Sequence, residues 1–180
     1  MSQFSPASAS HTSEKPALAT GQQFLRLYLV PETKVLLSIH QLSEVLTIPI
    51  GQIVSIPHMP AWVMGVYNWR GTILWMVDLG QLIGLTPWNQ QSVNSSSYIS
   101  VVFQDNSDDT ETNSTSHQIG LVVSNVEDLE WCDPTKFQDL PPSMMKTELA
   151  SFFRGYWLKP NGEMLVVLDG EAIMAAMPQP

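Results

Sequence analysis

The sequence predicts an all-β fold in which many short strands form an antiparallel sandwich or barrel. Short apolar segments rich in β-branched residues recur along the 180-residue chain, and Pro, Gly and Asn separate them. Only two segments have a helical pattern, so strands and helices do not alternate as they do in a parallel βαβ sheet. A repeated spacing of Gly and Asp further indicates two similar β-subdomains.

The predicted strands begin after a polar N-terminal tail. Residues 1–22 lack an apolar cluster and are expected to be disordered, and the folded domain is expected to span residues 23–180. Apolar residues alternate with polar ones from 24 to 30, the period of a half-buried strand, and residues 35–39 complete a hairpin. Further strands are predicted at residues 44–48, 52–56, 63–69, 72–77, 98–103, 118–124, 152–157 and 164–168.

Two short helices are predicted at residues 79–85 and 170–177, each directly after an Asp that can accept the free N–H groups of the first turn. Each Asp ends one copy of the repeat, in which a strand, a glycine turn and a second strand precede the capped helix. The repeated positions are Gly65, Gly71 and Asp78, and then Gly155, Gly162 and Asp169. Two similar subdomains explain this spacing, and convergence on a common hairpin-plus-helix form is the alternative.

The chain is acidic, with 8 Lys and Arg against 17 Asp and Glu and a net charge of −9. Residues 104–117 hold four of the acids and no Lys or Arg, and we interpret them as an exposed hairpin loop. A calcium loop is the sharper alternative, but the EF-hand spacing and flanking helices are missing. Nucleic acid and anionic membranes are not expected partners, because both bind clustered basic residues. No segment approaches the ~18 apolar residues that direct membrane insertion requires.

The sequence offers no constellation for catalysis. The four histidines lack metal-ligand spacing to another His, Cys or carboxylate, and no phosphate-binding loop or nucleophile elbow occurs. Cys132, the single cysteine, cannot form an internal disulfide, and its acidic neighbours raise the pKa of the thiol. We therefore expect a cytoplasmic protein that is not an enzyme and needs no metal or cofactor.

Arg70 is the most informative single residue. It is the only Lys or Arg between Lys34 and Lys136, and it lies in one of the most apolar parts of the chain. A cation in such surroundings needs an anionic or carbonyl partner, and the nearest candidate is Glu44 in an apolar segment. The alternative is a surface turn arginine without a partner.

These residues resemble the CheW-like domain of bacterial chemosensory systems, over about residues 24–177. The resemblance is carried by Leu42-Ser43-Glu44-Val45, Ile56-Pro57, Gly65-Val66-Tyr67-Asn68-Trp69-Arg70-Gly71 and Val77-Asp78-Leu79. In the second half, residues 119–123, Val126 and the unit from Gly155 to Asp169 resemble the family's second subdomain. The resemblance implies two five-stranded, SH3-like β-barrels packed together.

The resemblance also implies a function. CheW-like proteins are adaptors that link the regulatory domain of a CheA-type histidine kinase to the cytoplasmic tip of methyl-accepting chemoreceptors or photoreceptors. The resemblance implies that the adaptor and the kinase domain associate through edge-to-edge contact of their similar barrels. It also implies that a receptor helix lies in the groove between the two subdomains. The positions expected to bind partners are Leu42, Glu44, Gly65, Asn68, Trp69, Arg70, Gly71 and Val122.

Trp69, Trp75 and Trp62 are similar to the PilI or PixI branch, which serves type IV pilus motility and phototaxis. Ser124 stands where family members often carry Asp, which leaves the contacts of the second half open. Core packing is the other explanation for Trp69 and Trp75. A small-ligand-binding β-barrel, with the tryptophans lining a pocket, is the alternative function.

Overall fold

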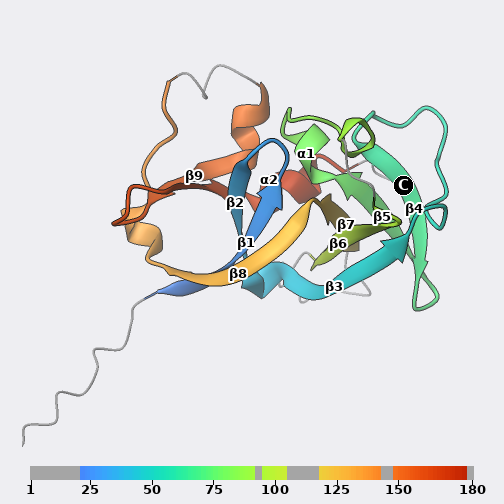
Figure 1. The fold of residues 1–180 in the computed structure, drawn as a ribbon, viewed down its shortest axis with the longest axis horizontal. Helices are drawn as coiled ribbons and strands as arrows, with labels where there is room; N and C mark the ends of the chain where they lie inside the picture. Colours follow the sequence, from blue (N-terminus) through green and yellow to red (C-terminus); the bar gives the residue numbers. More distant parts are fainter. Residues whose placement is uncertain (1–20, 92–94, 105–117, 143–147, 178–180) are drawn as a thin grey trace, which may run out of the picture.

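The computed structural model describes residues 21–91, 95–104, 118–142 and 148–177, which form two five-stranded β-barrels packed side by side (Figure 1). This confirms the predicted all-β class with two similar subdomains. The expected N-terminal tail and acidic loop lie almost entirely outside the described residues. Among the described residues, no helix is long and apolar enough to cross a membrane.

The first barrel is built from one continuous part of the chain. Its strands follow the spatial order β3-β6-β7-β5-β4, with β5 and β7 parallel and the other neighbours antiparallel. The strands are β3 (Leu42–Pro49), β4 (Val63–Trp69), β5 (Thr72–Asp78), β6 (Ser97–Gln104) and β7 (Gln118–Val123).

The second barrel combines the two ends of the chain, with the blue N-terminal strands lying among the orange and red ones (Figure 1). Its order, β8-β1-β2-β10-β9, repeats the pattern of the first barrel, including one parallel pair, β2 with β10. The strands are β1 (Gln22–Leu29), β2 (Thr33–Ser38), β8 (Asn125–Cys132), β9 (Phe153–Leu158) and β10 (Met164–Leu168). Residues 119–123 therefore form β7 of the first barrel, which corrects their expected place in the second subdomain.

The helical elements are short. They are α1 (Leu79–Leu82), α2 (Gly170–Ala175) and the 3₁₀ turns η1 (Ile39–Gln41), η2 (Trp88–Gln90), η3 (Pro134–Lys136) and η4 (Glu148–Phe152). Both predicted caps are present, because Asp78 accepts the Gln81 N–H at 3.0 Å and Asp169 accepts the Ala172 N–H at 3.1 Å. Each helix ends before the predicted boundary.

Equivalent glycines in the two barrels confirm the internal repeat. Gly65 on β4 and Gly155 on β9 have φ of 139° and 145°, a region open to glycine alone. A Cβ on Gly65 would collide with the Val54 carbonyl, and one on Gly155 with the Gln138 carbonyl. In each barrel, an irregular segment thus pairs with an edge strand through a single β-bridge. The bridges join Val54 to Val66 of β4 and Gln138 to Tyr156 of β9.

Three apolar cores hold the fold together. The largest lies between the barrels and contains residues of both sheets, among them Leu27, Val35, Val101 and Leu121. A smaller core fills each barrel. Side chains fill the interior of each barrel. The alternative function considered from the sequence, a β-barrel that binds a small ligand, is therefore not favoured.

Candidate functional site

The β4–β5 hairpin places Arg70 at its tip. Arg70 and Gly71 are the two loop residues, with φ of 52° and 83°, the pattern of a type I′ turn. Asn68 Oδ1 accepts the Gly71 N–H at 3.0 Å, which fixes the turn from inside. A non-glycine residue at positive φ is uncommon, and Arg70 adopts it at the tip of this hairpin.

Arg70 forms the ion pair that the sequence suggested. Its Nη2 lies 2.7 Å from Glu44 Oε2 on β3. Because β3 and β4 are the two edges of the sheet, the pair joins opposite edges of the first barrel. The side chains are 70% and 36% exposed, so the reason for the pairing is not relief of a buried charge. An exposed pair contributes about 0–1 kcal/mol to stability, because water and salt screen it.

Trp69 supports the guanidinium from below. The Arg70 Cζ lies 5.0 Å from the centroid of the Trp69 ring, within the range of a cation–π contact. The ring itself packs against the core of the first barrel. Trp69 therefore packs against the core, as one of the two explanations from the sequence expected, and in addition supports an exposed cation.

The second barrel contains a more buried counterpart of this arrangement. Lys159 follows β9, and its Nζ lies 2.7 Å from Glu130 on β8 and 5.8 Å from the centroid of the Trp157 ring. The Lys159 and Glu130 side chains are only 20% and 14% exposed. Glu130 and Glu127 also pair with Arg26 of β1. Each barrel thus has an ion pair that joins its two edge strands. The pair is largely buried in the second barrel and exposed to solvent in the first.

The remaining predicted partner-binding residues do not all reach the surface. Val122 is 1% exposed inside the first barrel, and Gly65 is buried beside the Val54 carbonyl, so neither offers a side chain to a partner. Leu42 begins β3 half-buried against the core between the barrels. The structure therefore brings Glu44, Asn68, Trp69, Arg70 and Gly71 together, and we call these five residues the hairpin site.

Several exposed apolar side chains were missed by sequence reasoning. Ile73, the register partner of Asn68, is 60% exposed, and Val45, next to Glu44, is 49% exposed. On β8, Leu129 and Trp131 are exposed as well. Figure 1 shows both edge strands, β3 and β8, on the side of the molecule opposite α1. The acids Glu127, Asp128 and Glu130 interrupt the apolar residues of β8, so its sequence did not show a regular strand pattern.

Nothing in the described residues resembles a reaction centre. No group of three or more His, Cys, Asp or Glu there could hold a metal ion. Burial, reinforced by Glu130, raises the pKa of the Cys132 thiol to about 11, which keeps it protonated and unreactive near neutral pH. The direction agrees with the sequence prediction, although burial is the larger cause.

The fold and the hairpin site define a double-barrel β domain whose distinguishing feature is an exposed charged and apolar surface. The family model described as CheW-like domain matches residues 23–177, so the chain belongs to the CheW-like domain family. A similar solved structure is the scaffolding protein TtCheW from Thermoanaerobacter tengcongensis. It has a TM-score of 0.64 and 21% identity, over 83% of this chain and 89% of that one. A comparison with curated protein sequences found no significant match.

Proposed function

We propose that this protein is a cytoplasmic, non-catalytic adaptor that couples the tip of a methyl-accepting chemoreceptor or photoreceptor to the regulatory domain of a CheA-type histidine kinase. Membership of the CheW-like family supports this function. A scaffolding protein with the same double-barrel fold supports it further. The observation that carries it is the exposed Glu44–Arg70 pair at the hairpin site.

The chemistry of the hairpin site suits a protein partner. An ion pair that remains exposed gives little stability to the fold, yet it offers a fixed guanidinium and carboxylate to another molecule. Val45 follows Glu44 on the exposed face of β3 and Ile73 pairs in register with Asn68, so both strands also carry exposed aliphatic side chains. Apolar anchors with a polar rim are the usual make-up of a groove that receives a helix. We assign this surface to the receptor tip.

The output of the pathway is part of the proposal. We assign the protein to the PilI or PixI branch and to control of type IV pilus motility, on the basis of its tryptophans. Trp62 and Trp75 pack against the core between the barrels, which leaves Trp69 as the tryptophan at the surface site. Deletion of the gene should abolish directed twitching or phototactic movement without loss of pili, and unchanged directed movement would contradict this assignment.

The test of the hairpin site is a charge-swap series measured by calorimetry with purified receptor tip. Arg70→Glu should weaken binding at least tenfold, and the double variant Glu44→Arg with Arg70→Glu should recover part of the loss. Lys136→Glu is the matched control, because Lys136 is 72% exposed and pairs loosely with Asp133 at 3.6 Å. Full binding by Arg70→Glu would exclude this surface, and absence of any complex with either partner would contradict the adaptor function.

A further inference from the structure

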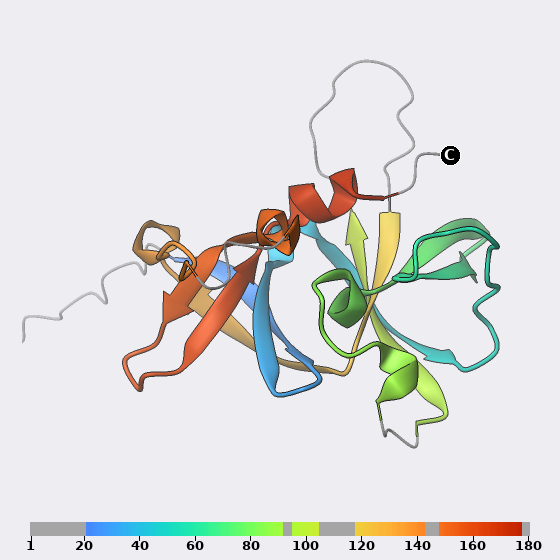
Figure 2. The same cartoon turned by 90° about the horizontal axis from the view of Figure 1, so that it is seen from above.

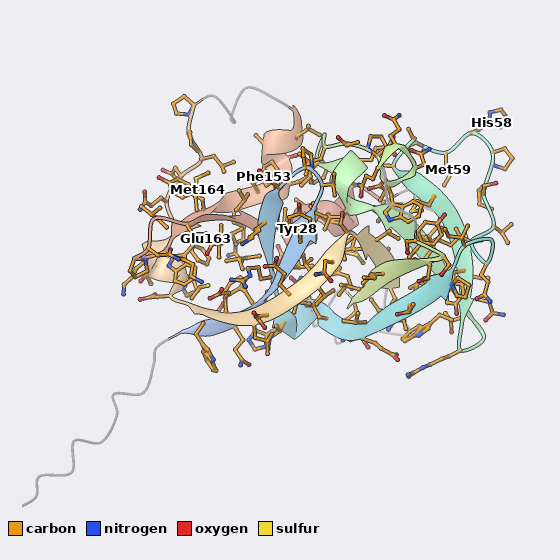
Figure 3. All side chains as sticks on the ribbon, viewed as in Figure 1. Tyr28, His58, Met59, Phe153, Glu163 and Met164 are labelled. Carbon is orange, nitrogen blue, oxygen red and sulfur yellow. The ribbon has the colours of Figure 1, made fainter. Side chains whose placement is uncertain are left out.

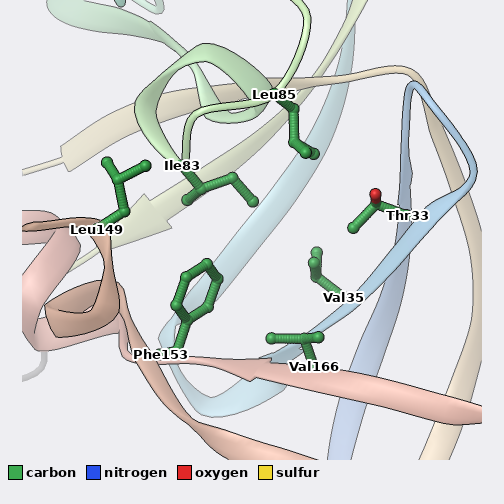
Figure 4. A pocket seen from close by; sticks show the side chains of 7 residues that line it. All are labelled: Thr33, Val35, Ile83, Leu85, Leu149, Phe153 and Val166. Atoms are coloured by element: carbon green, nitrogen blue, oxygen red, sulfur yellow. The ribbon is translucent and has the colours of Figure 1, made fainter. Parts of the chain in front are cut away.

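An apolar pocket lies where the two barrels meet. It has a volume of about 200 Å³. Figure 4 shows its walls, which come from β2, from the segment after α1, from η4 and from the β9–β10 hairpin. The residues that line it include Thr33, Val35, Ile83, Leu85, Phe153 and Val166. None of them belongs to the hairpin site.

The chemistry of the walls specifies an apolar occupant. Six of the seven lining residues have hydrocarbon side chains, and the exception is Thr33. Its hydroxyl donates a hydrogen bond to the Pro31 carbonyl at 2.9 Å. The lining side chains therefore leave no unused hydrogen-bond donor and a single hydroxyl oxygen as acceptor, so a polar occupant would lose its water with little compensation.

The size of the pocket specifies one bulky side chain. Sites for drug-sized ligands and cofactors are larger, about 300–1,000 Å³. An apolar cavity of about 150 Å³ holds one benzene molecule, so 200 Å³ accommodates a group the size of a Phe or Leu side chain. A single anchor in a well-packed pocket is how many protein partners obtain most of their affinity.

Apolar surface continues beyond the pocket, which indicates a partner larger than the pocket itself. Met164 lies two residues before Val166, on the same face of β10, and pairs in register with Leu158. These two side chains are 46% and 47% exposed. Figure 3 shows Phe153 and Met164 on the same barrel, far from His58 and Met59 at the end of the other. A segment anchored in the pocket could cover this pair.

The position and charge of the pocket separate it from the hairpin site. Figure 1 places α1 and the β1–β2 turn on the side opposite β3, and Figure 2 shows α1 and η4 from that side. An adaptor needs two surfaces that do not overlap. Glu32, exposed in the turn directly before Thr33, has no ion pair within the described part of the chain, so its carboxylate favours a basic neighbour.

We propose that this pocket is a second docking point, which receives one bulky apolar side chain, flanked by Lys or Arg, from a protein partner that does not use the hairpin site. The proposal rests on the adaptor function only in requiring a second partner. The occupant inserts between the barrels and contacts both, so the docked partner also fixes their relative position.

The first experiment examines the pocket alone. N-acetyl-phenylalanine amide is titrated into the full chain with labelled methyl groups, and N-acetyl-glutamine amide is the control probe. Saturable shifts confined to the methyls of Val35, Ile83, Leu85 and Val166, at millimolar concentration, are expected for the phenylalanine probe only. Absence of these shifts, or equal shifts with both probes, would overturn the proposal whatever the function of the protein.

The second experiment links the pocket to a partner. Leu85→Trp fills the pocket from its half-buried rim, and Ile50→Trp adds the same ring at a 48% exposed position of the first barrel as a control. Binding of receptor tip and kinase regulatory domain is measured for both variants and for Arg70→Glu, with thermal unfolding to verify folding. Leu85→Trp should lose at least tenfold affinity for the one partner that Arg70→Glu leaves unaffected. Retention of both partners by folded Leu85→Trp would refute the second docking point while leaving the adaptor function intact.

Discussion

Replacing Gly65 or Gly155 by Ala should destabilise the protein far more than replacing Gly162. All three have positive φ, of 139°, 145° and 85°. Ala at Gly162 meets no atom within 4 Å, so its cost is the backbone strain alone, about 1–2 kcal/mol. At Gly65 and Gly155 the new methyl also collides with a backbone carbonyl that bridges the edge strand. Strain of about 1–3 kcal/mol plus loss of that bridge gives about 3–5 kcal/mol.

Urea and thermal unfolding of the three variants measure this difference. For a chain of this size 1 kcal/mol lowers Tm by about 2–4 °C, so Gly155→Ala should lower Tm by about 6–20 °C and Gly162→Ala by half of that or less. Gly65→Ala and Gly155→Ala should also agree with each other, since the barrels use the same device. A Gly65→Ala variant as stable as Gly162→Ala would refute the close-approach reasoning.

Three further predictions concern other parts of the molecule. Cys132, with its pKa raised to about 11, should resist a thiol reagent at pH 8 in the native protein and react fully in urea, as followed by absorbance. The hydrogen bond from Lys34 lowers the pKa of Glu163 below 4.5, so its stabilising effect is present above pH 4.5 and is lost as pH falls through the lowered pKa. Glu163→Gln should therefore reduce the acid dependence of Tm below pH 4.5. Asn68→Ala removes the hydrogen bond to the Gly71 N–H and should cost about 0.5–1.5 kcal/mol in urea unfolding.

Each of these outcomes has a clear opposite. Rapid labelling of native Cys132 would show that the thiol is not buried. An unchanged acid profile in Glu163→Gln would assign the pH dependence to other carboxylates, such as Asp133, whose pKa is lowered by hydrogen bonds from Thr135. Full stability of Asn68→Ala would show that the positive φ of Arg70 and Gly71 is sufficient to form the turn.

Local chemistry explains what could be predicted from the sequence. The two capped helices and the glycine turns depend on neighbours within a few residues, so their spacing was visible before the fold was known. The Glu44–Arg70 contact joins residues 26 positions apart, and the scarcity of basic residues made it predictable. Its exposure was not, because an apolar sequence context does not show on which side of a barrel a hairpin tip lies.

Strand β8 was missed because its pattern is inverted. Glu127 and Glu130 pair with Arg26 of the neighbouring strand β1, and Glu130 also pairs with Lys159 after β9. Leu129 and Trp131 face solvent. Charged residues on the inward face are tolerated only because cations from β1 and from the β9–β10 turn compensate them. Conversely, residues 52–56 have an apolar, strand-like composition but form only the bridge from Val54 to Val66.

The interleaving of the chain has a consequence for biosynthesis. All five strands of the first barrel are available once residue 123 has left the ribosome, whereas β1 and β2, which are made first, lack β8, β9 and β10 until residue 168 has emerged. Domains commonly fold during synthesis as soon as their strands are complete. The hairpin of β1 and β2 must therefore stay unpaired on both edges while the strands of the first barrel are completed, and residues 125–168 then supply the three strands that complete the second barrel around it.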